Sequence, residues 1–96
     1  MSQIYTYHGN YYTRLYHHFI IEIEAESFEE ANAKAEAYLK DKTNHESIVE
    51  DADVECDDNL RLRDHIQYFQ ENAEIVRCEE EDGDEIEEFD GIALNN

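Results

Sequence analysis

The sequence predicts a small α+β domain in which an antiparallel sheet has one or two helices packed on one face. From Phe19 to Glu26 apolar and acidic residues alternate with a period of two, which is typical of a strand with one buried face. A helical pattern begins directly afterwards. Ser27 and Glu30 have the spacing of a capping box, and apolar residues then recur at helical intervals. The strand and the helix therefore share one apolar side.

The first two strands are expected between residues 4 and 26. The return strand runs from Tyr16 to Glu26, and the residues before it are rich in strand formers. Two positions of the hairpin turn stay open, Gly9-Asn10 and Arg14-Leu15, because both leave two strands of reasonable length. The helix that follows is expected over about Phe28 to Lys40. Its apolar side consists of Phe28, Ala31, Ala35, Tyr38 and Leu39.

The second half of the chain completes the expected order ββα(β)αββ. The bracketed strand is an optional short one at Ser47–Val49, followed by an acidic loop from Glu50 to Asp58. The helical period then returns with Leu62, Ile66, Phe69 and Ala73 on one face, and with Asp57, Asp58 or Asn59 as N-cap. A strand over 73–78 and a turn at Asp82-Gly83 lead toward Ile86, Phe89 and Ile92.

Length and charge limit the classes of protein to which the chain can belong. Its 96 residues make one domain, 1–96, and a hydrophobic content of 41% is enough for a core, which argues against wholesale disorder. The 26 acidic residues against 7 basic ones give a formal net charge of −19, and every acid lies from Glu22 onward. The amino-terminal part is neutral and rich in tyrosine. Crowded like charges should lower stability but favour solubility.

The expected location is the cytoplasm. The sequence has no apolar run that could cross a bilayer, and its first residues do not form a secretory signal. Anionic lipid would repel the acidic surface, so no membrane partner is expected. Cys56 and Cys78 are too few for a disulfide scaffold and are expected to be reduced thiols.

Two acidic segments are the candidate functional surface. Glu22 to Glu26 alternate along a strand, and carboxylates fill every position from Glu79 to Asp90 except Gly83, Ile86 and Phe89. Ile86 and Phe89 would anchor one face of a hairpin while carboxylates line the other, as a row that imitates backbone phosphates. The alternative is that these acids only solvate the surface. The residues expected to contact a partner are Glu22, Glu24, Glu26, Glu79, Glu80, Glu81, Asp82, Asp84, Glu85, Glu87 and Glu88.

No metal, cofactor or catalytic site is expected. An EF-hand starting at Asp51 would need glycine and glutamate where the chain has Cys56 and Leu62. His17 and His18 point to opposite faces of a strand, and the other histidines and both cysteines are scattered without the spacing of zinc ligands. The chain has no glycine-rich phosphate loop and no nucleophile motif, so an enzyme is not expected.

Two resemblances bear on function. Ile21 to Ala31, followed by Lys34-Ala35, resembles the strand-to-helix junction of small DpnD/PcfM-like proteins of phages and mobile elements. In size and charge the chain resembles phage-encoded acidic inhibitors that mimic DNA, of the anti-restriction and anti-CRISPR type. That resemblance implies a counter-defence factor whose partner is a basic nucleic-acid-binding protein, such as a host defence nuclease or a CRISPR effector. The protein itself would not bind nucleic acid.

An adaptor or structural protein is the alternative function. Five tyrosines occur in the amino-terminal hairpin. Those on one face of the strands could belong to the core, while those on the other face form a protein interface or a homodimer seam. In this interpretation the acids serve only solubility. The tyrosines concerned are Tyr5, Tyr7, Tyr11, Tyr12 and Tyr16.

Overall fold

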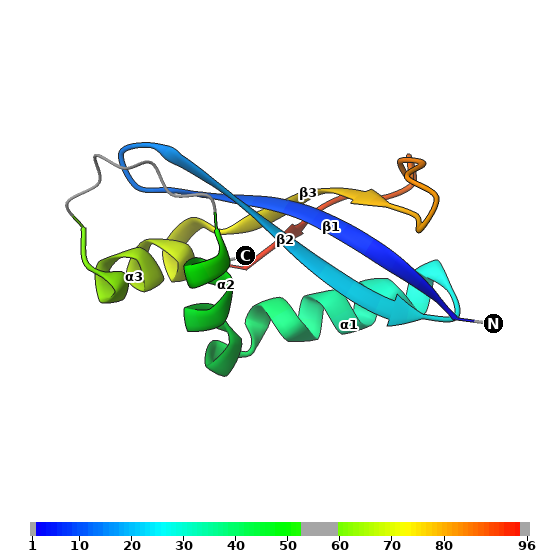
Figure 1. Ribbon diagram of the computed structural model, residues 1–96, viewed down its shortest axis with the longest axis horizontal. Helices are drawn as coiled ribbons and strands as arrows, with labels where there is room; N and C mark the ends of the chain where they lie inside the picture. The colour runs from blue at the N-terminus through cyan, green and yellow to red at the C-terminus, as the bar shows by residue number, and fades with distance from the viewer. Residues whose placement is uncertain (1, 53–59, 95–96) are drawn as a thin grey trace.

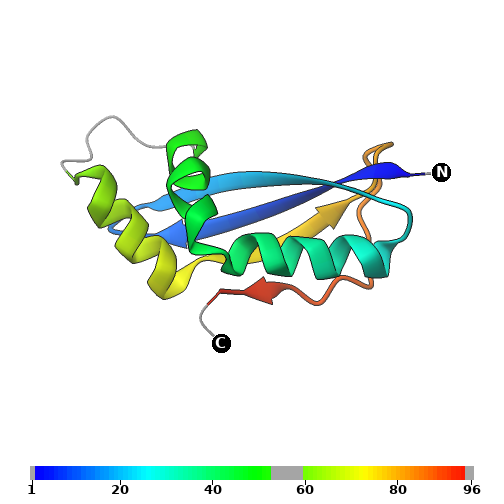
Figure 2. The same ribbon diagram turned by 90° about the horizontal axis from the view of Figure 1, so that it is seen from below.

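A computed structural model describes residues 2–52 and 60–94, and it has the α+β architecture that the sequence predicts. Four antiparallel strands form one sheet in the order β2-β1-β3-β4, and the helices all lie against one of its faces (Figures 1 and 2). The strands are β1 (Gln3–Tyr12), β2 (Tyr16–Ala25), β3 (Glu74–Glu79) and β4 (Ile92–Ala93). The helices are α1 (Phe28–Lys40), the 3-10 turn η1 (Lys42–Asn44), α2 (His45–Asp51) and α3 (Leu62–Asn72).

The β1–β2 hairpin is the longest continuous pairing of the sheet. Its register runs from Gln3 opposite Ala25 to Tyr12 opposite Tyr16, so the chain turns at residues 13–15. Of the two expected turn positions, Arg14-Leu15 is therefore right. Gly9 instead lies within β1, at a register shift against β3, where a Cβ atom would overlap the Phe19 ring and the Glu74 carbonyl oxygen. Glycine is required here by close packing.

The two strands bury alternate residues, as period-two patterning requires. The inward residues of β1 include Tyr5, Tyr7 and Tyr11, and those of β2 include Phe19, Ile21 and Ile23. On the helices Ala31, Ala35, Leu39 and Phe69 complete the core. Phe69 is central, because its ring centroid lies 5.2 Å from that of Phe19 and 5.5 Å from that of Tyr11.

Helix α1 has the predicted bounds and cap. The Glu30 N–H donates to Ser27 Oγ at 3.2 Å, while the Glu30 carboxylate accepts from the Glu26 N–H at 3.3 Å. Tyr38, expected on the apolar side, is 36% exposed. Phe28 is only half-buried and contacts the rings of Tyr5 and Phe89 at the margin of the core.

Residues 47–49, expected as an optional strand, belong to helix α2, so that expectation is wrong. His45 explains the difference. Its Nε2 donates to the Leu39 carbonyl oxygen at 2.7 Å and its Nδ1 accepts from Gln70 Nε2 at 3.1 Å, and these contacts join α2 to α1 and α3. Glu50 and Asp51 end this helix and buried Ala52 is its C-cap, while residues 53–58 of the expected acidic loop lie outside the described residues.

Helix α3 follows its expected periodicity only in part. Phe69 is fully buried and Ile66 half-buried, but Leu62 is 37% exposed. The cap position is Arg61, whose N–H donates to the Asp64 carboxylate at 3.2 Å, so the expected cap at residues 57–59 is wrong. None of the described helices is long and apolar enough to cross a membrane; α1, the longest, has 13 residues.

Polar side chains are also buried in the core, and they have partners. Tyr11 Oη lies 2.9 Å from His65 Nδ1, and Thr13 Oγ1 lies 2.9 Å from His17 Nε2. Tyr7 Oη donates to Asn32 Oδ1 at 2.7 Å. Cys78 is a buried free thiol beside Tyr7, and Cys56 lies outside the described residues. These bonds fix which aromatic rings meet between the sheet and the helices.

Replacing Phe69 with alanine should lower the free energy of unfolding by about 3–5 kcal/mol, because a fully buried ring leaves a cavity among Tyr11, Phe19 and His45. Phe28→Ala should cost clearly less, since the half-exposed ring loses less buried area. Urea unfolding of both variants tests this. Equal losses would contradict the position of Phe69 at the centre of the core.

Stability should fall in alkali. Burial raises the pKa of Tyr7 above its ordinary 10.0, and burial likewise raises the pKa of Cys78 above 9.0. The folded state therefore keeps protons that the unfolded chain releases, so the two groups lower the free energy of unfolding progressively as the pH rises through 9 and 10. One such group contributes a slope of up to about 1.4 kcal/mol per pH unit.

The measurement is urea unfolding between pH 7 and 11 for the wild type and for Tyr7→Phe, which has no phenol to ionise. The variant should show the shallower decline above pH 10. Parallel declines in the two proteins would show that Tyr7 does not carry the effect.

Candidate functional site

The candidate site is the face of the sheet opposite the helices, which we call the open face. Burial alternates so regularly along β1 and β2 that the outward residues are unambiguous, and β3 adds those directly opposite Asn10, His8 and Thr6. The open face consists of Ile4, Thr6, His8, Asn10 and Tyr12 on β1, Tyr16, His18, Ile20, Glu22 and Glu24 on β2, and Glu74, Arg77 and Glu79 on β3. It has an acidic end, a histidine centre and an aromatic end.

The acidic end brings together carboxylates that are far apart in sequence. Glu22 lies opposite Thr6, Thr6 lies opposite Glu79, and Glu79 forms an isolated bridge with Glu85. Because neighbouring strands are about 4.8 Å apart, the backbones of Glu22 and Glu79 are separated by about 10 Å across β1. Glu24 extends the row along β2, and Ser2 Oγ donates to its carboxylate at 3.0 Å. We call Glu22, Glu24, Glu79 and Glu85 the acidic end.

The other acids expected to contact a partner do not continue this row. Glu80, Glu81, Asp82 and Asp84 form a turn, closed by bonds of 2.9 Å from the Glu80 N–H to the Asp84 carbonyl oxygen and 2.8 Å from the Gly83 N–H to the Glu80 carbonyl oxygen. Gly83 has a φ of 93°, as the predicted Asp82-Gly83 turn requires. The acidic segment from Glu79 to Asp90 therefore reverses direction at the predicted turn, and Glu79 and Glu85 pair across it. The remaining predicted acids, Glu26, Glu87 and Glu88, are exposed and outside the strands.

Ile86 and Phe89 anchor this acidic segment, as predicted. Both are half-buried against the core, and the Phe89 ring meets those of Tyr7 and Phe28 at centroid distances of 5.5 and 6.5 Å. Within the turn, single carboxylate oxygens of Glu80, Asp82 and Asp84 lie within 4.8 Å of one another. The anchored turn holds a dense group of negative charges beside the acidic end.

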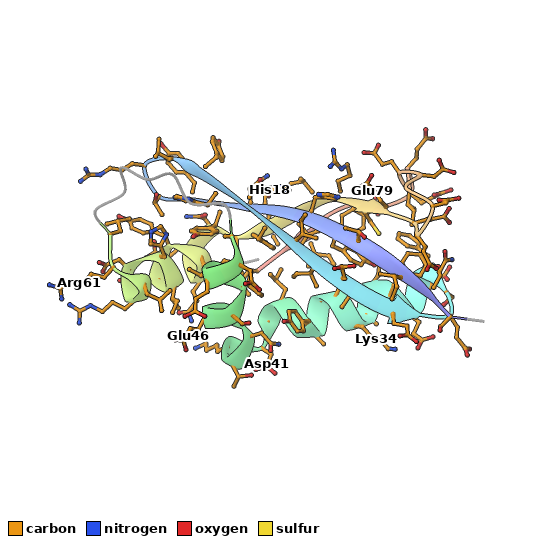
Figure 3. The ribbon with its side chains drawn as sticks, in the orientation of Figure 1. His18, Lys34, Asp41, Glu46, Arg61 and Glu79 are labelled. Carbon is orange, nitrogen blue, oxygen red and sulfur yellow. The ribbon has the colours of Figure 1, made fainter. Side chains whose placement is uncertain are left out.

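The centre of the open face carries a polar chain that the sequence did not predict. His8 Nδ1 and His18 Nε2 lie 3.3 Å apart, His8 Nε2 contacts Glu79 Oε1, and His18 Nδ1 is 3.3 Å from Asn10 Oδ1. Figure 3 labels His18 and Glu79 along the upper, helix-free side of the sheet. His17, the neighbour of His18, points into the core, so the expectation that the two face opposite ways is confirmed. Only the strand pairing reveals His8 as the partner of His18.

The aromatic end lies at the hairpin turn. Tyr16 is 76% exposed and Tyr12 46% exposed, their ring centroids are 5.0 Å apart, and Leu15 beside them is also exposed. Tyr5, Tyr7 and Tyr11 are buried. The five tyrosines are thus divided between core and surface by strand alternation, and two of them could meet a partner.

Lysines pair with carboxylates of the helix layer and not with those of the open face. Lys34 pairs with Glu30 at 3.0 Å, and Lys40 pairs with Glu36 at 2.9 Å. The Lys34 ammonium lowers the pKa of the Glu30 carboxyl group. At the acidic end, Arg77 is the neighbouring cation, 3.9 Å from both Glu79 and Glu85. The acidic end therefore keeps a strongly negative field.

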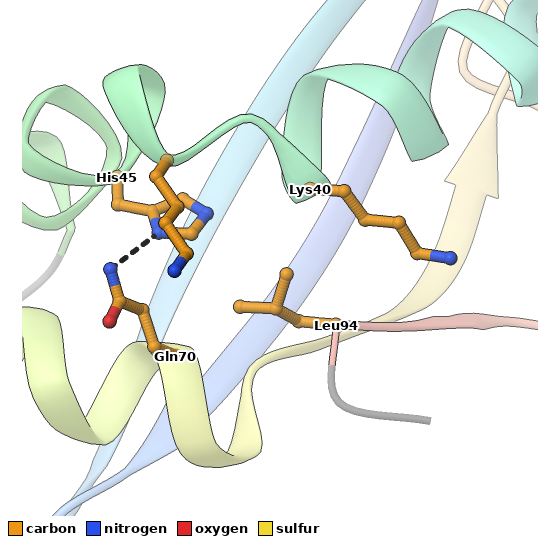
Figure 4. A pocket seen from close by; sticks show the side chains of 5 residues that line it. Lys40, His45, Gln70 and Leu94 are labelled. Carbon is orange, nitrogen blue, oxygen red and sulfur yellow. Dashed lines mark hydrogen bonds between the residues drawn. The ribbon is translucent and has the colours of Figure 1, made fainter.

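A separate hollow of about 380 Å³ lies on the helix side (Figure 4). Lys40, Lys42, His45, Gln70 and Leu94 line it. The two bonds of His45 occupy both ring nitrogens, and Lys40 is engaged with Glu36. Within the described chain Lys42 has no ion-pair partner, so one positive charge could attract a ligand here. The open face has many more polar and charged side chains that a partner could contact.

None of the family models, curated proteins or solved structures with which the chain was compared matches it. The residues of the open face are therefore the basis for a functional assignment.

Salt that screens the negative charges should stabilise the protein. Raising the ionic strength from about 0.01 to 0.15 M shortens the Debye length from about 30 to 8 Å, which weakens repulsion among like charges. The melting temperature should rise over this range, because the net charge is −19 and the acidic end is poorly compensated. Calorimetry in sodium chloride measures the change. A flat or falling melting temperature would show that charge crowding does not limit stability.

Proposed function

We propose that this protein binds a basic, nucleic-acid-binding protein through the acidic end of its open face and excludes nucleic acid from that partner. The observation that carries the proposal is the meeting of Glu22 and Glu24 with Glu79 and Glu85 on one side of the sheet. Acidic residues that only confer solubility would not need to lie together on one side of the sheet.

The spacing of these groups suits a phosphate-binding surface. Residues two apart on a strand are separated by about 6.6 Å, and each strand crossed adds about 4.8 Å. Grooves that bind nucleic acid present lysine and arginine to a dense array of phosphates, and much of their affinity comes from that electrostatic contact. Carboxylates on paired strands can bind the same cations without the cost of ordering their backbone, because the sheet already holds it.

Direct binding of nucleic acid is not part of the proposal, because a net charge of −19 would repel phosphate. We assign the protein no catalytic step. Its partner would be an enzyme such as a host defence nuclease or a CRISPR effector, and it would act in the cytoplasm, where such enzymes meet foreign nucleic acid.

A specific observation favours a second candidate function, that of an adaptor. Tyr12 and Tyr16 form an exposed aromatic pair next to Leu15, and exposed tyrosines are frequent anchors of protein interfaces. In that case the acidic end would only solvate the protein. A homodimer through the aromatic pair is one form of this function.

A competition assay tests the proposal. Labelled DNA or RNA bound to a captured partner protein should be displaced by the wild type, and displacement by Glu22→Gln/Glu24→Gln/Glu85→Gln should be weaker by about tenfold or more, since rim charge pairs contribute cumulatively to association. The matched control is Glu29→Gln/Glu46→Gln/Glu50→Gln, which removes the same charge from exposed positions of the helix layer. Binding of the wild type should also weaken steeply with salt.

The control variant distinguishes an effect of where the carboxylates lie from an effect of the net charge. Equal displacement by both triple variants would show that only the total charge matters, and a ternary complex of partner, protein and nucleic acid would exclude mimicry. Tyr12→Ser/Tyr16→Ser distinguishes the adaptor, which predicts a large loss of binding from this variant, with little dependence on salt.

A further inference from the structure

The paired histidines of the open face have the geometry of metal ligands. His8 on β1 lies opposite Ile20, and His18 on β2 lies opposite Asn10, so the two side chains are diagonal neighbours across the hairpin. His8 Nδ1 and His18 Nε2 are 3.3 Å apart, while the ring centroids are 5.4 Å apart with planes inclined by 25°. The rings therefore meet edge to edge, with one nitrogen of each facing the other.

The outer nitrogen of each ring faces an oxygen. His8 Nε2 contacts Glu79 Oε1, and His18 Nδ1 lies 3.3 Å from Asn10 Oδ1. Each oxygen accepts a hydrogen, which places the proton of each neutral imidazole on its outer nitrogen and a lone pair on its inner one. Two lone pairs at 3.3 Å repel unless a cation lies between them. A carboxylate or amide oxygen behind each imidazole is also the usual support of metal-bound histidine.

The distance between the inner nitrogens fits zinc. Zinc–nitrogen bonds are about 2.0–2.1 Å long, so two nitrogens at a tetrahedral angle on one ion are about 3.3–3.4 Å apart. The observed 3.3 Å matches this separation, and a tilt of both rings would turn their lone pairs toward an ion beside the line that joins the two nitrogens. The geometry points to a binding site for a divalent transition-metal ion of the zinc class, held by His8 Nδ1 and His18 Nε2, with Glu79 and Asn10 as positioning residues.

The surrounding charge favours a cation. Glu79, Glu85 and Glu22 lie on the same side of the sheet, and Arg77 is the opposing charge nearby, 3.9 Å from Glu79 and Glu85. Two protein ligands leave coordination positions that water or a side chain of a bound partner completes. The site lies between the acidic and aromatic ends, so an ion there would be next to either proposed interface.

The turn formed by Glu80, Asp82 and Asp84 is a second group of possible metal ligands, and it serves as the control for the histidine site. It offers oxygen atoms alone, which suit hard ions such as calcium and magnesium, whereas imidazole nitrogen suits zinc, nickel and copper. Zinc bound by the histidines should therefore be insensitive to changes in the turn.

The experiment is calorimetric titration of the untagged full chain with zinc chloride at pH 7.5. The wild type should bind one zinc ion at a site that His18→Gln weakens by about tenfold or more, because only one of two ligands remains. Asp82→Asn/Asp84→Asn should keep the affinity of the wild type. His18 is exposed, so circular dichroism of His18→Gln should match that of the wild type.

Nuclear magnetic resonance supplies a second readout. In nitrogen-15 spectra of the histidine rings, zinc should shift His8 Nδ1 and His18 Nε2 as directly bound atoms, while their outer nitrogens stay protonated. The proposal is overturned by wild-type zinc affinity in His18→Gln, by loss of binding in the turn variant alone, or by a wild type that binds no zinc. In the last case a shared proton occupies the space between the rings.

Discussion

The register of the β1–β2 hairpin is the constraint on which the rest of the structure depends. Ten residues of each strand are paired, and alternate positions of both go to the core. A slip of β2 by one residue would expose Phe19 and bury Glu22 and Glu24 without partners. The same alternation that builds the core thus assigns the acids, the two histidines and the exposed tyrosines to the other side.

Local patterns made β2 and α1 predictable. The alternation from Phe19 onward and the Ser27–Glu30 cap involve residues close in sequence, so they can be recognised without the fold. The structure confirms the predicted bounds of α1 and the antiparallel α+β class. Helix α2 could not be found in this way. Its short apolar pair, Ile48-Val49, suits a strand equally well, and two bonds of His45, a local one to Leu39 and a long-range one to Gln70, hold it against the core.

The candidate site was predictable in composition and not in arrangement. Its acids were visible as runs, but the meeting of Glu22 with Glu79 requires β1 to lie between β2 and β3, which no local pattern encodes. The proximity of His8 and His18 depends in the same way on strand register. Local signals did predict the turn at Asp82-Gly83 and the anchors Ile86 and Phe89, because a glycine and two isolated apolar residues mark them within a run of acids.

Strand β2 is one edge of the sheet, whereas the other edge is only the two residues of β4. A ten-residue edge offers unpaired backbone groups to another copy of the chain, and natural sheets guard such edges with charge. Glu22 and Glu24 lie along this edge, so the carboxylates proposed to attract a basic partner also repel a second copy. Near the isoelectric point of about 4.2 the net charge vanishes, so repulsion between copies weakens and the edge is less protected against intermolecular strand pairing.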